Sequence, residues 1–505
     1  MKGENKILKV NQIKHGAILS YVLITVNALY GLIMAPYILS QIGESDYGVY
    51  KTIASFSATI MVLDFGIGTT VMRYTAKFRA ERKKEEIANF AAMGLIEAGV
   101  MVGIATIICT AIFIWLPSFY AGVFSTEQID LARRLFFILS INMVLVIVEN
   151  VLNGVITGTD HFVFSNGIKL TLLVLRILAT FAWLKQWKSA IVLVMLTLIV
   201  TIATIVFQLI FIRYKLQIRI RLKRWDHCLF RESLGYMLAM FVQTLVVQAN
   251  GNVDNVVISR VIGPEAVAVY SIGIQLFSMY ESFAMAFSNL MLPTVSKQIS
   301  EGASYTELQE TVTRIGRMQF IVLGAALSGF LCLGKDFVYL WLGNGFEDAY
   351  YLSLILMFPA TFTLIQNVCL SILRAKNMMR FRTWSLVFSL IFNIIFTIAG
   401  TILWGYYAAA IGTALSILLW YVIAMNIYYH KKIGFRVFKF YSDVFSRLLI
   451  CIIIPSLVTI MMNFIAEATW LWLIIRIIAF VIVYLLVLWF YGLTKQEKKT
   501  IINRS

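Results

Sequence analysis

The chain of 505 residues is 60% hydrophobic and 14% charged, and its formal net charge is +17. The apolar residues fall into runs of about 20, long enough to cross a hydrocarbon layer about 30 Å thick, which excludes a soluble globular protein. The cations are divided among short connections rather than gathered on one surface. They therefore indicate membrane orientation and contact with anionic membrane lipids, and not nucleic-acid binding.

The apolar runs predict an all-α polytopic membrane protein with about fourteen transmembrane helices. In chain order, the predicted spans are 15–39, 49–72, 91–116, 135–157, 168–184, 189–212, 233–258, 266–292, 318–342, 350–373, 383–403, 406–429, 445–466 and 470–492. The first apolar stretch is too long for a signal peptide and lacks a small-residue cleavage pattern, so we expect the first helix to be retained.

The distribution of cations predicts the orientation of these spans. With a cytoplasmic N-terminus, the even-numbered connections and both tails hold 34 of the 43 Lys and Arg residues, and eight lie in or beside the outer connections. Cytoplasmic connections of membrane proteins carry such an excess of cations. We therefore expect both the N- and the C-terminus to be cytoplasmic.

One sequence motif occurs twice, as Ile42 to Tyr50 and, 220 residues later, as Ile262 to Tyr270. Six predicted spans separate the two copies, and an even number means that both copies cross the membrane in the same direction. The predicted organisation is an N-terminal six-helix lobe (1–212), a basic cytoplasmic linker (213–232), a C-terminal six-helix lobe (233–430) and two additional transmembrane helices with a cytoplasmic tail (431–505). Transporters built from repeats bind their substrate at the repeat interface, so the repeat favours transport.

Two connections carry recognisable patterns. Residues 215–223 of the linker alternate charged or polar with apolar residues, and we expect the linker to bury its Leu and Ile side chains at the membrane interface while its cations face headgroups. Ser304 to Glu307 is a capping-box sequence, followed by apolar residues at helical spacing. It predicts a short amphipathic helix on the membrane surface, with a solvated loop as the alternative.

Two spans carry polar stripes. Asn142, Glu149 and Asn153 lie on one face of span four. Span seven repeats the spacing with Gln243, Asn250 and Asp254. The stripes predict helices that line a water-accessible cavity, and the alternative is hydrogen bonding between helices.

Several cations stand within spans or near their ends. Lys169 and Arg176 lie about two turns apart on one face of span five, where they form a cationic ladder leading inward. Lys51, Arg73 and Arg260 stand near other span ends. All five are candidates for binding an anionic headgroup; snorkelling explains the three at the span ends equally well, and a salt bridge to Glu149 is the alternative for Arg176.

Carboxylates inside the spans are candidates for ion coupling. Asp64 stands in the sequence Leu63-Asp64-Phe65-Gly66-Ile67-Gly68, where we expect the helix to bend or break. Asp64, Glu149, Asp254 and Glu281 are candidates to take up a coupling proton or cation, and the alternative is a paired or protonated structural carboxyl. Cysteine spacing predicts neither a disulfide nor a metal site, and we expect no cofactor. The absence of a P-loop motif leaves two energy sources, a proton or sodium gradient or the consumption of the product.

A set of residues resembles the signature of bacterial polysaccharide repeat-unit flippases, which belong to the multidrug/oligosaccharidyl-lipid/polysaccharide exporter superfamily. These residues are Asn27, Gly31, Pro36, Gly43, Tyr47, Gly48, Tyr50, Leu63 to Gly66, Arg73, Tyr74, Gly158, Phe162, Asn166, Asp254, Gly263 and Tyr270. The resemblance implies a V-shaped pair of lobes in the bacterial cytoplasmic membrane that flips an undecaprenyl-pyrophosphate-linked oligosaccharide to the outer leaflet by alternating access. It also implies a cationic cavity and, as partners, polymerase or other assembly proteins.

Three other functions are weighed against this one. A lipid-linked peptidoglycan-precursor flippase has the same expected architecture. A multidrug/cation antiporter of the same superfamily is expected to have an acidic, aromatic cavity and twelve spans. A membrane polymerase or ligase is expected to have a long outer loop with catalytic residues, whereas the longest outer connection here, 117–134, contains no His. We therefore expect a transporter and not an enzyme.

Overall fold

The computed structural model describes residues 2–375, 378–464, 467–495 and 497–498, without the side chains of 2–14, 17, 239, 242–243, 286–297, 300 and 375. Every regular element in these ranges is a helix. The chain forms two compact units, Met1–Ala268 and Val269–Ser505. The predicted lobe and linker boundaries follow the repeat and stay a prediction.

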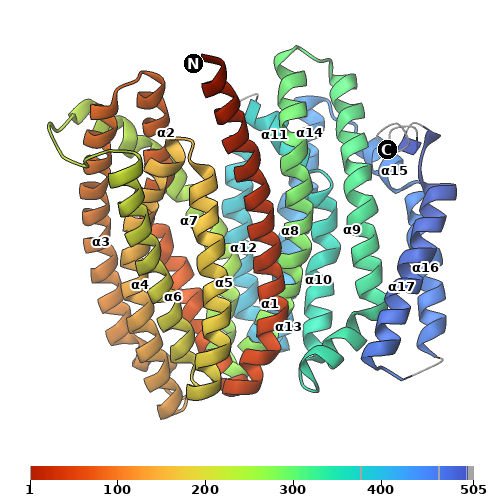
Figure 1. Ribbon diagram of the computed structural model, residues 1–505. Coiled ribbons are helices and arrows are strands. Elements are labelled where there is room, and N and C mark those ends of the chain that lie inside the picture. Colours follow the sequence, from red (N-terminus) through yellow and green to blue (C-terminus); the bar gives the residue numbers. More distant parts are fainter. Residues whose placement is uncertain (1, 376–377, 465–466, 496, 499–505) are drawn as a thin grey trace. The chain divides into compact units, whose positions relative to one another are not determined.

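Unit 1 (Met1–Ala268) is a bundle of long helices (Figure 1). Its elements are α1 (Lys2–Ile60), the 3₁₀ helix η1 (Met61–Asp64), α2 (Ile67–Ala80), α3 (Lys84–Tyr120), α4 (Thr126–Gly158), α5 (Phe162–Trp187), α6 (Ala190–Ile210), the π-helix η2 (Phe211–Lys215), α7 (His227–Val261) and the start of α8 (Pro264–Ser300). Within the unit α4 packs against α2, α3 and α6, and α1 packs against α5 and α7.

Unit 2 (Val269–Ser505) contains the rest of α8 and the remaining helices. They are α9 (Tyr305–Leu342), α10 (Glu347–Leu364), α11 (Asn367–Ala375), α12 (Arg380–Trp404), α13 (Tyr406–Ser416), the π-helix η3 (Ile417–Ala424), α14 (Met425–Ile433), α15 (Val437–Phe445), α16 (Leu448–Asn463), α17 (Trp470–Val487) and the π-helix η4 (Leu488–Gly492). In this unit α16 and α17 pack against each other and against α9 (Figure 1).

The structure confirms an all-helical, multi-pass membrane architecture. Among the described residues, nine helices are long and apolar enough to cross a membrane, or up to eleven if each of two bent pairs is one span. The predicted number of fourteen is thus not confirmed. Part of the difference arises because Ile18–Ala80, which holds two predicted spans, counts as one continuous candidate.

The repeated motif corresponds to a repeated helix break. Gly43 lies at φ 80° and kinks α1, and Gly263 lies at φ 130° between α7 and α8. Only glycine adopts positive φ without steric cost, which explains why both copies carry Gly at this position. The two copies therefore share a local structure as well as a sequence.

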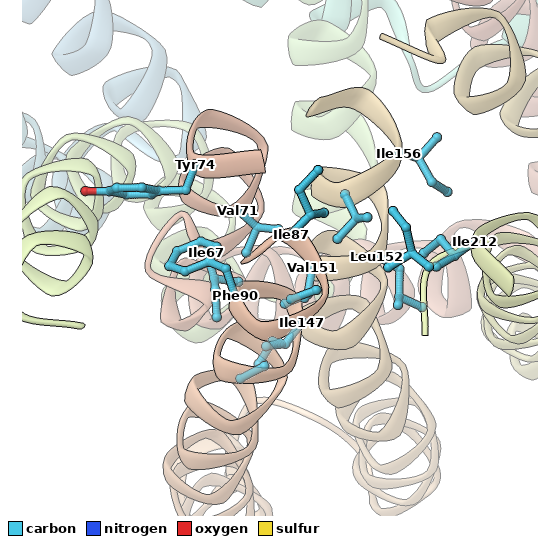
Figure 2. Packing of buried hydrophobic residues seen from close by; sticks show 14 of the residues in the cluster. Ile67, Val71, Tyr74, Ile87, Phe90, Ile147, Val151, Leu152, Ile156 and Ile212 are labelled. Carbon is cyan, nitrogen blue, oxygen red and sulfur yellow. The ribbon is translucent and has the colours of Figure 1, made fainter. Parts of the chain in front are cut away.

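The core of unit 1 contains a cluster in which α2, α3 and α4 meet (Figure 2). Val71 and Tyr74 of α2, Phe90 of α3 and Val151 of α4 are at most 2% exposed. The helices approach closely because Gly154 of α4 faces α2: a Cβ added there would lie 2.5 Å from the backbone oxygen of Gly68. Small residues at helix contacts allow such packing in membranes.

Two predicted connections differ in part from the structure. The linker forms no strand in its described residues, and Ile218 is buried and packs on the core cluster of unit 1 with Leu216 and Ile220. Ser304 caps α9 and makes both bonds of the capping box. The expectation of a separate short surface helix is wrong, because α9 continues without a break from Tyr305 to Leu342.

Candidate functional site

The predicted break at Asp64 is confirmed and is held by the Asp64 carboxylate. Phe65 and Gly66 both lie in the left-handed region, with φ of 51° and 67°. Asp64 Oδ1 accepts a hydrogen bond from the Gly66 backbone N–H at 2.8 Å, and Oδ2 accepts one from Asn150 Nδ2 of α4 at 2.9 Å. The carboxylate thus compensates for backbone bonds lost at the break and ties it to α4.

The polar stripe of α4 bonds to neighbouring helices. Asn153 Oδ1 accepts a hydrogen bond from Ser165 Oγ of α5 at 2.6 Å, and Glu149 Oε1 accepts one from Gln208 Nε2 of α6 at 3.4 Å. Asn142 is 6% exposed, and its Oδ1 has no hydrogen-bond partner among the described residues. The bonds of Asn153 and Glu149 are of the interhelical kind that the alternative interpretation describes.

The polar stripe of α7 is only partly described, because the side chain of Gln243 lies outside the described residues. Asn250 Nδ2 donates to the Val246 carbonyl of its own helix at 3.0 Å. Asp254 is 4% exposed. Its neighbour Asn255 donates from Nδ2 to Ser55 Oγ of α1 at 2.8 Å, so this part of α7 is anchored to α1.

Arg176 of α5 lies in a cationic and aromatic cluster with α1. Its guanidinium carbon stands 5.8 Å from the centre of the Tyr30 ring, and its charge is within electrostatic reach of the Tyr50 hydroxyl, as is that of Lys51. We call Tyr30, Tyr50, Lys51 and Arg176 the Arg176 cluster. All four side chains are half-buried.

The Arg176 guanidinium carries its charge without a salt bridge. Among the described residues no carboxylate lies within 4.0 Å of it, so the alternative of a bridge to Glu149 is wrong. Its buried Nε has no hydrogen-bond partner there either. A half-buried cation with unused donors can bind an anion that brings its own oxygen acceptors.

The other predicted cations lie apart from this cluster. Arg73 is exposed and stands 4.7 Å from the Tyr236 ring centre, and Arg260 stands 5.6 Å from the Phe119 ring centre. Lys169 is half-buried on α5. Glu281 is a half-buried residue of α8 in unit 2. The structure thus brings together two of the five predicted cations, Lys51 and Arg176.

Sequence reasoning missed two polar residues of this region, Asn150 and Gln208, which are the partners of Asp64 and Glu149. Glu97 of α3, which the sequence places inside a span, is a 6% exposed carboxyl whose Oε1 has no hydrogen-bond partner in the part of the chain that the structure describes. Asn150 follows Glu149 directly in the sequence, so it faces another side of the helix and falls outside a stripe chosen by face.

Solved structures with this fold are membrane transporters. One titled "Lipid II flippase MurJ, inward closed conformation" has a TM-score of 0.71 and 13% identity, and the match covers 94% of this chain and 97% of that one. An inward-facing multidrug resistance MATE family transporter of the MOP superfamily has a TM-score of 0.65 and 16% identity, with 84% and 99% of the chains covered. This chain therefore shares its fold with these two proteins.

Sequence comparison defines the family. The profile of the family described as "Polysaccharide biosynthesis protein" matches residues 13–299, and the MatE profile matches 239–399. A protein of Salmonella typhi named "Putative O-antigen transporter" is 22% identical over 322 residues, which are 63% of this chain and 72% of the relative. The chain belongs to the polysaccharide biosynthesis protein family of MOP-superfamily flippases and transporters. The relatives named here are transporters or flippases and not enzymes, which is consistent with the expected transporter.

Proposed function

We propose that the protein flips an undecaprenyl-pyrophosphate-linked oligosaccharide repeat unit from the cytoplasmic to the outer leaflet of the bacterial cytoplasmic membrane. Both termini face the cytoplasm in this proposal. The transported unit supplies surface polysaccharide biosynthesis, and a membrane polysaccharide polymerase is the kind of partner that consumes it. The O-antigen transporter named among the relatives supports this substrate class.

The observation that carries the proposal is the unpaired Arg176. A cation this far inside a span costs free energy unless a partner compensates for its charge, and no carboxylate among the described residues does so. A pyrophosphate headgroup supplies that charge and several acceptor oxygens. Lys51 and the hydroxyls of Tyr30 and Tyr50 add a second cation and two donors beside it.

The energy source in this proposal is a proton or sodium gradient, and Glu149 is the coupling carboxylate we favour. Asp64 receives two hydrogen bonds at 2.8 and 2.9 Å and holds a helix break, which is a structural task. The hydrogen bond that Glu149 accepts from Gln208 is longer, at 3.4 Å. A weakly bonded carboxylate exchanges a proton or cation at less cost than one fixed by two short bonds.

Complementation of a bacterial strain that lacks its own repeat-unit flippase tests the proposal, with surface polysaccharide as the readout. Wild-type protein restores the polymer and Arg176→Ala does not, although the variant is present at the same level in the membrane. Lys185→Ala is the matched control, because Lys185 is an exposed cation of the same helix. Full complementation by Arg176→Ala would refute the assigned role.

A multidrug/cation antiporter is the second candidate, favoured by the MatE profile match over residues 239–399. In an antiporter of cationic drugs, an unpaired cation beside the substrate would repel the drug. Drug resistance conferred by the wild type and kept by Arg176→Ala therefore indicates an antiporter. Rescue of a strain depleted of its peptidoglycan-precursor flippase, without rescue of surface polysaccharide, indicates a lipid II flippase instead.

A further inference from the structure

A polar cavity of about 610 Å³ lies in unit 2, at the N-terminal end of α9. Its walls come from the first turns of α9, from α15 and from the segment that follows η4. The Arg176 cluster belongs to unit 1, so this cavity is a separate site.

The floor of the cavity is a buried ion pair. Arg317 and Glu497 are each 8% exposed, and Arg317 Nε donates to Glu497 Oε1 at 3.0 Å. Arg317 also donates from Nη1 to the Asp443 carbonyl at 2.7 Å and from Nη2 to the Gly492 carbonyl at 3.1 Å. These bonds join α9 to α15 and to the end of η4.

The rim of the cavity carries charges of both signs that are not paired with each other. Arg314, Arg436 and Lys439 line it, as do the carboxylates of Glu310 and Asp443. Among the described residues none of the five makes an ion pair within 4.0 Å. The rim therefore offers three cations and the carboxylates of Glu310 and Asp443 to a ligand that carries both charges. The carboxylate of Glu307 lines the same cavity and accepts the Ser304 backbone N–H at 2.8 Å.

An apolar groove of about 520 Å³ is lined by residues of α9, α10 and α16 and by Phe445 at the end of α15. Phe320 lines this groove and stands one turn along α9 from Arg317, which lines the polar cavity. On α15, Phe445 lines the groove and Asp443 lines the cavity. Leu331 and Leu457 of the groove are 52% and 56% exposed, so the groove is open along its side.

We propose that the cavity and the groove together bind one phospholipid whose headgroup carries a phosphate and a primary ammonium. The phosphate binds to Arg314, Arg436 and Lys439, the ammonium binds to Glu310 or Asp443, and an acyl chain lies in the groove. In the predicted orientation this lipid comes from the inner leaflet. The match of charges selects an aminophospholipid over a purely anionic lipid. A purely anionic lipid has no cation that could pair with the carboxylates of Glu310 and Asp443.

Lipid retention by the purified, full-length protein tests the assignment. Delipidated protein is supplied with equal amounts of phosphatidylethanolamine, phosphatidylglycerol or phosphatidylcholine, and bound lipid is counted by native mass spectrometry alongside the melting temperature. We expect phosphatidylethanolamine to be retained about fivefold more than either of the others. The double variant Arg436→Gln/Lys439→Gln reduces the retention of phosphatidylethanolamine about tenfold.

Three further variants separate the contributions. Lys431→Gln/Lys432→Gln is the matched control, because both cations are exposed, precede α15 and lie outside the cavity lining. We expect this control variant to retain lipid like the wild type. Glu310→Gln/Asp443→Asn removes the preference for phosphatidylethanolamine over phosphatidylglycerol. Leu331→Trp fills the groove and weakens retention of all three lipids.

Two outcomes overturn the assignment. One is equal retention of the three lipids by the wild type, or unchanged retention by Arg436→Gln/Lys439→Gln. The other is that inorganic phosphate alone raises the melting temperature as much as lipid does, and that Leu331→Trp shows the same rise. That result identifies a site for free phosphate instead of a lipid site. Melting temperatures without lipid show whether each variant is folded.

Discussion

Gly48 of α1 lies against Pro264 so closely that a Cβ atom added to Gly48 would stand 1.8 Å from the Pro264 carbonyl oxygen. The two residues occupy the first and second copies of the repeated motif. The motif thus places its copies in direct contact within unit 1, and the contact depends on the missing side chain at Gly48.

The first prediction is that Gly48→Ala destabilises the protein by about 1–3 kcal/mol or more, because backbone must move to admit the methyl group. The control is Gly99→Ala in α3, where an added Cβ meets nothing within 4 Å. That change is neutral or stabilising by up to about 1 kcal/mol, because Ala favours the helix. Thermal unfolding in detergent compares the two variants, and equal melting temperatures would contradict the contact.

The hydrogen bond between Asp64 and Asn150 gives a second prediction. In a double-mutant cycle of Asp64→Ala and Asn150→Ala, we expect a coupling free energy of about 1.5–3 kcal/mol, typical of a hydrogen bond to a charged group. Asn153→Ala replaces Asn150→Ala in the control cycle, because Asn153 bonds to Ser165 and not to Asp64. A coupling free energy near zero in the first cycle would show that the bond does not hold the break.

The pair formed by Arg476 and Asp336 gives a third prediction. Arg476 of α17 is 1% exposed and donates to Asp336 Oδ2 of α9 at 2.8 Å. Asp336→Leu leaves a buried cation without this partner and destabilises by about 3 kcal/mol. Adding Arg476→Met removes that cation, so the double variant recovers most of the lost stability. If the double variant is less stable than Asp336→Leu alone in thermal unfolding, the loss of the ion pair is not the cause of the destabilisation by Asp336→Leu.

The fourth prediction concerns pH and Glu497, which follows η4 and lies outside the membrane-spanning helices. Burial alone raises the pKa of this carboxyl, but hydrogen bonds from Arg317 and Thr494 outweigh burial, and the pKa lies below its ordinary value of 4.5. A lowered folded-state pKa means that the bonds stabilise fully above the unfolded-state pKa and are lost as the pH falls through the folded-state pKa.

We therefore expect the wild type to melt at a higher temperature than Glu497→Gln at pH 7, and the difference to shrink as the pH falls below about 4.5. Glu467→Gln, at an exposed carboxyl of the same unit, serves as the control and shows no such trend. A difference in melting temperature between the wild type and Glu497→Gln that stays constant from pH 7 to pH 3 would contradict the role of the ionised carboxylate.

Local features were predictable from the sequence where a particular backbone conformation favours one residue type, such as glycine at positive φ or serine at the start of a helix. Gly43 and Gly263 mark positive φ, Gly66 marks the break after Asp64, and Ser304 marks the start of α9. The resemblance was sufficient to predict the family.

Contacts between distant segments were not predictable in this way. Arg317 and Glu497 are 180 residues apart, and nothing near either residue indicates the other. The polar stripe of α4 shows the same limit, because its spacing fits both a cavity and bonds to α5 and α6. Periodicity gives the face of a helix, but only packing determines what that face meets.

The most direct test of the central claim is flipping by the purified protein in proteoliposomes. An undecaprenyl-pyrophosphate-linked oligosaccharide is placed in one leaflet, and its arrival in the other is followed by accessibility to a sugar-modifying enzyme outside the vesicle. We predict rapid transfer with the wild type and with Lys185→Ala, and transfer at the rate of empty vesicles with Arg176→Ala. Transfer by Arg176→Ala at the wild-type rate would contradict the claim that this cation receives the headgroup.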